Sequence, residues 1–272
     1  MKPVMKAVGW VAAYFVLQLA VQLGFSALAV ASGVGGPAEM SEWMAQRLLL
    51  ASLCSNLLFL ALALLFRRRA GAGWGWSEGR GAFKGCGAAC IITFSFSMFF
   101  SLVSSGLDVS QLPLDKSTAY FSAQLPGLGP VLMAVNLLVL APVAEEVLFR
   151  GILIGQLSKK YSRRASVLIS ALLFGFLHIM AGGPLLALGA VAMGALFGLV
   201  YIKTGSLQTA VVAHCAANLP DFVLLVLPLA AGWWRALLAA AMLAARGWTN
   251  QEIAQHMNIS QRGRDPGTQK NK

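Results

Sequence analysis

Three charged residues stand close together inside a long apolar stretch of the sequence. Glu145 and Glu146 are adjacent, and Arg150 follows the second of them by four positions, within an apolar segment that runs from Val131 to Ile154. A charged side chain in the middle of a bilayer costs roughly 2.5–3.5 kcal/mol even on the more lenient insertion scale, so it needs a partner, water or a chemical role. The search for function therefore starts at this cluster.

Two of the three histidines also lie inside apolar segments. His178 ends the sequence Phe174-Gly-Phe-Leu-His178. His214 begins His214-Cys-Ala-Ala-Asn218, which places Asn218 one helical turn later on the same face. Counted from the nearest basic flank at 1.5 Å per residue, Glu145 and His178 lie about 21 Å along their helices and His214 about 17 Å. We therefore expect three separate helices to present polar groups at a similar depth.

The two carboxylates in this cluster suggest different roles, one structural and one in general base chemistry. Glu146 and Arg150, at i and i+4, are expected to form a structural pair, because an arginine cannot act as a base and can hold a carboxylate charged. Glu145 has no partner on its own helix and is therefore the candidate general base. Phe174 is expected to pack against the wall of the site.

The composition indicates an integral membrane protein. Of 272 residues, 58% are hydrophobic and only 11% are charged, unlike a soluble domain. Seven windows are long enough to cross about 30 Å of hydrocarbon: 7–32, 47–66, 86–106, 127–154, 165–181, 184–202 and 206–230. An eighth, shorter window at 232–245 carries Arg235, so it either spans with a tilt or lies at the interface. The expected fold class is all-α, a polytopic transmembrane helix bundle of about eight helices.

The basic residues indicate how the chain is oriented. The net charge is +11, but lysines and arginines gather in short loops at alternate ends of the spans, which is the pattern of cytoplasmic loops. Both termini and the loops around Arg68 and Lys160 are therefore expected inside, and the loop from Asp108 to Lys116 outside. This predicts a multi-pass protein of a bacterial-type plasma membrane with no nucleic-acid partner. The first apolar stretch lacks a convincing cleavage site and is expected to remain as an anchor.

Three motifs together resemble those of a known family. Glu145-Glu146-Val-Leu-Phe-Arg150, Phe174-xxx-His178 and His214-xxx-Asn218 match, in order and spacing, the signature motifs of the CAAX protease and bacteriocin-processing family (CPBP, or Abi) of intramembrane proteases. The resemblance covers roughly residues 131–219. It implies that Glu145 is the general base, that His214 helps to orient the water, and that His178 and Asn218 face the oxyanion. It also implies a protein or peptide substrate in or at the membrane, in some members a prenylated one.

The resemblance leaves a role for a metal open. No HExxH motif is present, which excludes a thermolysin-type zinc helix. The family carries both a metalloprotease label and a metal-free glutamate mechanism. Glu145, His178 and His214 would be the ligands of zinc or another divalent metal if one is held. We favour the metal-free mechanism, because Glu146 is expected to be occupied by Arg150 and no other carboxylate remains to orient a ligating histidine.

We expect one membrane domain in three parts. These are N-terminal transmembrane helices and loops at 1–126, a CPBP-like catalytic core at 127–230, and a possible last helix with a basic tail at 231–272. Four cysteines lie in apolar segments and indicate neither a disulfide framework nor a metal pair. Gly189, Gly194 and Gly198 are expected to allow close helix packing.

The C-terminal tail contains a partial motif. Residues 247–260 resemble the start of a LuxR-type helix-turn-helix, but Gly and Pro follow at 261–267, where the recognition helix should lie. An amphipathic cytoplasmic helix is the expected outcome.

A structural role for the polar residues is the competing interpretation. A lone His or Asn in a membrane often only hydrogen-bonds a neighbouring helix, at about 0.6 kcal/mol on average. The chain would then be a non-proteolytic membrane scaffold or a bacteriocin-immunity protein. A transporter with a proton-relay carboxylate is less favoured, because no internal repeat is detectable. Asp221, beside Pro220, is expected to satisfy broken helix geometry and to take no part in chemistry.

Overall fold

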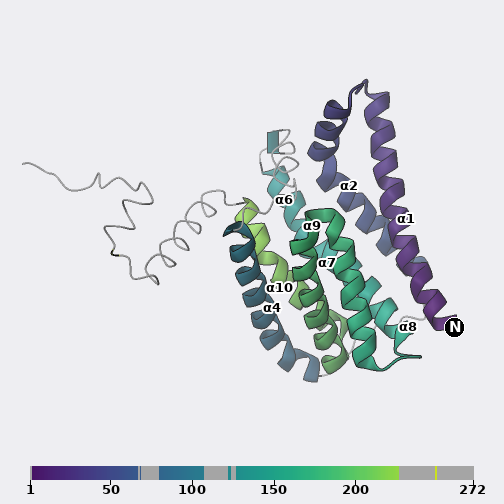
Figure 1. Ribbon diagram of the computed structural model, residues 1–272, viewed down its shortest axis with the longest axis vertical. Coiled ribbons are helices and arrows are strands. Elements are labelled where there is room, and N and C mark those ends of the chain that lie inside the picture. The colour runs from purple at the N-terminus through teal and green to yellow at the C-terminus, as the bar shows by residue number, and fades with distance from the viewer. Residues whose placement is uncertain are drawn as a thin grey trace, which may run out of the picture. The chain divides into compact units, whose positions relative to one another are not determined.

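All the elements of the described structure are helical. The computed structural model describes residues 2–66, 80–106 and 127–226, together with positions 68, 122–123 and 249 (Figure 1). The chain divides into two compact units, Met1–Val226 and Leu227–Lys272, and all the helices below lie in the first. The all-α class is confirmed. The window at 232–245 and the tail motif lie outside the described residues, and the division into three parts stays a prediction.

The helices pair along the chain into a bundle. Helix α1 (Lys2–Ala31) forms a hairpin with α2 (Pro37–Leu65), as Figure 1 shows. Helix α4 (Arg80–Gly106) packs along α10 (Leu207–Val226). Between these pairs lies a continuous helical rod over residues 128–157. Its segments are α6 (Leu128–Val135), η1 (Asn136–Leu140), α7 (Ala141–Glu146), η2 (Val147–Ile154) and α8 (Gly155–Leu157).

The rod contains a π-helical segment on each side of the two glutamates. Segments η1 and η2 enclose α7, which ends at Glu146. Pro142, near the start of α7, has no backbone N–H and interrupts the regular hydrogen-bond ladder where η1 ends. π-Helical turns inside α-helices occur often at functional sites. In this chain they mark the part of the rod that carries the charged cluster.

Helix α9 (Arg163–Thr204) turns back on itself in the middle. Gly183 has a φ of +76°, a conformation that L side chains rarely adopt, and Pro184 follows it. The two halves pack closely, because a Cβ on Gly194 would lie 3.1 Å from Ala171 Cα and one on Gly198 2.7 Å from Val167 Cγ1. The packing role predicted for these two glycines is confirmed, and α9 contains the windows predicted at 165–181 and 184–202.

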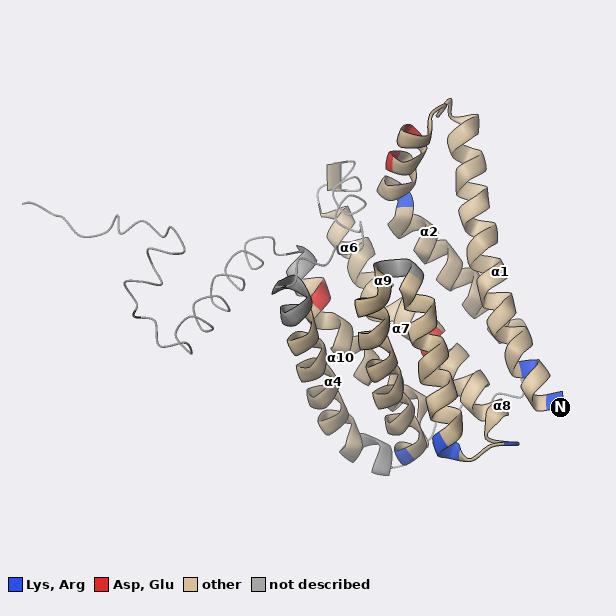
Figure 2. Ribbon diagram, viewed as in Figure 1, with Lys and Arg blue, Asp and Glu red and all other residues tan. Residues whose placement is uncertain are grey.

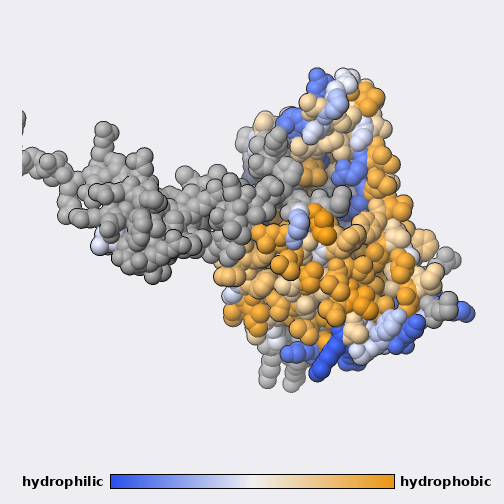
Figure 3. All heavy atoms as spheres, in the orientation of Figure 1, coloured by the Kyte–Doolittle hydropathy of each residue, from blue (hydrophilic) through white to orange (hydrophobic). Residues whose placement is uncertain are grey.

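Several helices are long and apolar enough to cross a membrane. Four described segments meet this criterion by length and composition: Lys2–Ala31, Pro37–Leu65, Leu128–Leu157 and Gly183–Thr204. Gly85–Ser101 is a shorter apolar helix. Figure 3 shows hydrophobic residues over much of the described face, as lipid contact requires. The chain is a multi-pass membrane protein, and the count of about eight crossings stays a prediction.

Charged residues gather at opposite ends of this unit. Figure 2 shows lysines and arginines at the lower ends of the helices, and acidic residues at the upper end of α2 with a basic residue below them. The upper acids include Glu39, in the first turn of α2. Orientation in a membrane follows the positive charge, so the lower end is expected to face the cytoplasm.

This orientation can be tested with single cysteines in a version that lacks the four natural ones. Lys160→Cys, at an exposed position between α8 and α9, is expected to react with a membrane-impermeant maleimide only from the cytoplasmic side. Gly35→Cys, in the exposed turn between α1 and α2, is expected to react only from outside. Labelling of both positions from the same side would contradict the topology.

Candidate active site

A buried ion pair forms the centre of the candidate site. The Nη1 of Arg150 donates to Oε1 of Glu146 at 2.9 Å, and both side chains are fully buried. The Nη2 of Arg150 donates to the backbone oxygen of Gly194 at 2.7 Å. The guanidinium also lies over the rings of Phe174 and Phe197, at 5.1 and 5.2 Å from their centroids. Arg150 therefore joins η2 to the second half of α9 through charge, hydrogen bonds and aromatic contacts.

The same carboxylate oxygen also holds His214. The Nδ1 of His214 lies 2.9 Å from Oε1 of Glu146, and the imidazole stacks on Phe197 with 4.3 Å between centroids. An ionised carboxylate only accepts hydrogen bonds, so Nδ1 carries a proton, and in the neutral imidazole Nε2 is then the acceptor. The predicted pairing of Glu146 with Arg150 is confirmed. The expectation that no carboxylate remains to orient a histidine is wrong, because i+4 spacing does not reveal a partner on another helix.

Glu145 faces the other nitrogen of the same ring. Its Oε2 lies 3.7 Å from Nε2 of His214, too far for a direct hydrogen bond. Its side chain is 19% exposed, whereas that of Glu146 is 0% exposed. Adjacent positions on a helix point in directions about 100° apart, since a turn holds 3.6 residues. The two glutamates therefore occupy different environments: Glu146 is enclosed in the protein and Glu145 borders accessible space.

His178 joins this group through Phe174. The Nδ1 of His178 lies 2.7 Å from the backbone oxygen of Phe174 and must donate, because a carbonyl oxygen only accepts. The ring of Phe174 lies 4.5 Å from that of His178 and 5.9 Å from that of His214, between centroids. Phe174 is itself buried and thus forms a wall that both imidazoles contact.

Asn218 and Asp221 lie further along α10. Asn218 donates an amide N–H to the backbone oxygen of Leu137, in η1, at 2.8 Å. An amide nitrogen carries two protons, so a second donor remains for another acceptor. Asp221 accepts a hydrogen bond from Ser101 of α4 at 2.6 Å. Helix α10 continues past Pro220 to Val226. The expected break in the helix is therefore wrong, and Asp221 connects two helices.

The structure thus brings together Glu145, Glu146, Arg150, Phe174 and His214, and places His178 against Phe174. The sequence did not predict that Phe197 stacks on His214, because this side chain carries no polar signal. It also did not predict the hydrogen bonds of Asn218 to the Leu137 carbonyl and of Arg150 to the Gly194 carbonyl.

The described residues do not form a recognisable metal centre. No three His, Cys, Asp or Glu side chains in the described part of the chain are grouped so that they could hold a metal ion. Glu145, His178 and His214, the ligand set expected if a metal is bound, are not such a group in this arrangement.

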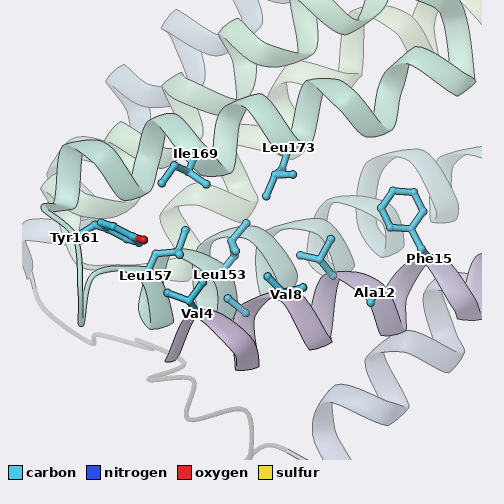
Figure 4. Close-up of a pocket in the computed structure, with 11 residues that line it drawn as sticks. Val4, Val8, Ala12, Phe15, Leu153, Leu157, Tyr161, Ile169 and Leu173 are labelled. Carbon is cyan, nitrogen blue, oxygen red and sulfur yellow. The ribbon is translucent and has the colours of Figure 1, made fainter. Parts of the chain in front are cut away.

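An apolar groove lies between α1, the end of the rod and the first half of α9. Its volume is about 500 Å³ (Figure 4). Figure 4 shows Tyr161 near one end of the groove and Phe15 near the other. The walls are made almost entirely of apolar side chains, from Val4, Ala7, Val8, Val11, Ala12, Phe15, Leu153, Leu157, Tyr161, Ile169 and Leu173.

The described part of the chain is thus an all-helical membrane unit with a buried carboxylate–histidine cluster. Residues 127–220 match the family model of Type II CAAX prenyl endopeptidase Rce1-like proteins. The matched segment contains all seven predicted site residues, and the match confirms the family resemblance seen in the three motifs. No match was found among curated proteins or among solved structures. The family supports an intramembrane endopeptidase of the CAAX protease type in general.

The buried ion pair predicts that substitution of Arg150 destabilises the protein far more than substitution of an exposed arginine. Arg150→Ala leaves the Glu146 carboxylate without its main partner, and breaking a buried pair in this way costs about 3–5 kcal/mol. We expect a large loss of folded yield and a lower unfolding temperature for the purified protein. Arg164→Ala, at an exposed position in the first turn of α9, is the matched control and should behave as the wild type. Equal stability of the two variants would contradict the structural role of Arg150.

Proposed function

We propose that the chain is an intramembrane endopeptidase in which Glu145 activates the water that attacks a peptide bond. The observation that carries this proposal is the 3.7 Å separation of Oε2 of Glu145 and Nε2 of His214. Both atoms accept hydrogen bonds, and a single water at about 2.8 Å from each fits between them. Two acceptors on one water fix its lone pairs toward an incoming carbonyl, as general base catalysis requires.

The proposed reaction follows from these donors and acceptors. The water oxygen bonds to the carbonyl carbon, while Glu145 takes the water proton. The C–N bond then breaks, and Glu145 returns that proton to the leaving amine. The free N–H of Asn218 is the proposed donor to the oxyanion. His178 donates its Nδ1–H to Phe174, so it assists through Nε2 only when the ring carries both protons.

The groove supports a lipid-modified substrate. A volume of about 500 Å³ lies within the range of roughly 300–1,000 Å³ that is usual for small-molecule sites. An isoprenoid chain has no polar atoms, so an apolar groove can hold it without leaving a buried polar group unpaired. We therefore propose a membrane-bound protein or peptide that carries a prenylated cysteine near its C-terminus as the substrate.

One feature favours a different function. Arg150 and His214 both hydrogen-bond Oε1 of Glu146 inside the bundle, as they would in a cluster that only holds helices together, although Oε2 of Glu146 and Nε of Arg150 are buried without a partner in the described structure. A non-proteolytic membrane scaffold or immunity protein would need no more than this. The two functions differ in what they require of Glu145, because that residue contributes no hydrogen bond to the cluster in the described structure.

Glu145→Gln tests the proposal, because it keeps the size of the side chain and removes the base. We expect the rate of cleavage to fall by about 10²–10⁴, with an unchanged unfolding temperature. The measurement uses the full-length protein in lipid nanodiscs and a fluorescence-quenched peptide that ends in S-farnesyl cysteine and three further residues. Asn218→Ala is expected to lose about 10²–10³. Glu39→Gln, at an exposed position in α2, is the control and should retain full activity.

Two results would decide against this assignment. Wild-type rates in both Glu145→Gln and Asn218→Ala would exclude these residues from the chemistry. A wild-type protein that cleaves neither the farnesylated peptide nor its unmodified counterpart would favour the scaffold.

Dependence on metal is the second test. We propose the metal-free version, because a water held by Glu145 and His214 over their 3.7 Å separation would need no metal ligand. Dialysis against a chelator is therefore expected to leave the rate of peptide cleavage unchanged. Loss of activity that is restored specifically by zinc, with near-stoichiometric zinc in the purified protein, would replace the direct mechanism with a metal-assisted one.

A further inference from the structure

A row of three polar side chains joins α2 to η1, the first π-helical segment of the rod. Nδ2 of Asn56 donates to Oδ1 of Asn136 at 3.0 Å, and Nδ2 of Asn136 donates to Oγ of Ser52 at 2.9 Å. Ser52 and Asn56 are one helical turn apart on α2, so the amide of Asn136 is held at both ends. Asn56 and Asn136 are only 3% and 6% exposed, and α2 and the rod also bury an apolar cluster at this interface. The hydrogen bonds of the row therefore lie in an apolar setting, where a broken one leaves a polar group unpaired.

The residue after Asn136 has a backbone carbonyl that lacks its usual donor. In a π-helical turn the C=O of residue i accepts from the N–H of residue i+5. The N–H of Ala141 donates in this way to the carbonyl of Asn136. For the carbonyl of Leu137 the corresponding donor would be Pro142, which has no N–H. Asn218 of α10 donates to this carbonyl at 2.8 Å, so a side chain takes the place of the missing backbone donor.

Segment η1 thus holds Asn218 on one side and is held by α2 on the other. Asn136 and Leu137 are consecutive, so a shift of η1 that moved the Asn136 amide away from α2 would also move the Leu137 carbonyl. The amide of Asn218 is planar, and the direction of its second N–H therefore follows from the first, which Leu137 accepts. That second N–H is the proposed donor to the oxyanion. It must be placed accurately, because a misplacement of about 1 Å can cost 10²-fold in rate.

We propose that Asn136 is a positioning residue of this site: held between Ser52 and Asn56, it fixes the Leu137 carbonyl that orients the amide of Asn218. The inference rests on the proposed role of Asn218 as the oxyanion donor. None of the three motifs contains Asn136, and Ser52 and Asn56 lie outside the matched residues 127–220. A row that only fastened α2 to the rod would affect activity equally with and without the Asn218 amide, and this difference provides the test.

A double-mutant cycle separates positioning from a structural role. Asn136→Leu keeps the approximate size of the side chain and removes both of its hydrogen bonds. In nanodiscs, with the farnesylated quenched peptide, we expect kcat to fall about 10-fold with little change in KM. The loss should be smaller than that of Asn218→Ala, because Asn136 acts only through Asn218. In the Asn218→Ala background, Asn136→Leu should therefore cause no further loss. A wild-type rate for Asn136→Leu, or an equal loss in both backgrounds, would overturn the proposal.

Two serines of α2 provide a milder comparison, which decides the question if Asn136→Leu does not fold. Ser52→Ala removes the acceptor of the Asn136 amide and is expected to lower kcat about 3-fold, again only when Asn218 is present. Ser55→Ala is the matched control, because the Ser55 hydroxyl is buried as well but donates to the carbonyl of Ala51 in its own helix. This control should cleave at the wild-type rate. Equal rates for the two serine variants would contradict the positioning role.

A measurement without substrate tests the contact itself. The side-chain amide signal that disappears from the nitrogen–proton NMR spectrum in Asn218→Ala belongs to Asn218, and its position depends on the hydrogen bond to Leu137. We expect this signal to shift in Asn136→Leu and Ser52→Ala and to stay in place in Ser55→Ala. An unshifted signal in the first two variants would overturn the proposal even in a protein that cleaves the peptide. If the wild type does not cleave, the proposed function fails, while the signal still decides whether Asn136 positions Asn218.

Discussion

One oxygen atom, Oε1 of Glu146, connects three helical segments of this protein. It accepts hydrogen bonds from Arg150 and His214, both at 2.9 Å, in a part of the bundle that excludes solvent. A charged carboxylate at this depth is stable only with such donors, and the arginine likewise needs the carbonyl of Gly194. That carbonyl is within reach because glycine lets the two halves of α9 approach closely at residue 194. The packing of small residues and the stability of the ion pair therefore depend on each other.

This constraint separates the tasks of two neighbouring glutamates. Glu146 is enclosed and fixes the tautomer of His214, whereas Glu145 borders open space and faces the free nitrogen of that ring. Removing Glu145 would leave the buried ion pair intact, but removing Arg150 would leave a charge unpaired. For this reason the Glu145→Gln variant can separate chemistry from folding, and a substitution at Arg150 cannot.

Local rules predicted part of this arrangement from the sequence. The pairing of Glu146 with Arg150 follows from i+4 spacing, and the windows at 165–181 and 184–202 follow from apolar length with Gly and Pro between them. The contact of Glu146 with His214 was not predictable, because it depends on which helices pack together over 68 positions. The π-helical segments were not predicted either, since the only residue that indicates them in the sequence is Pro142, which interrupts a regular helix. The roles of the site residues remain predictions that the variants test.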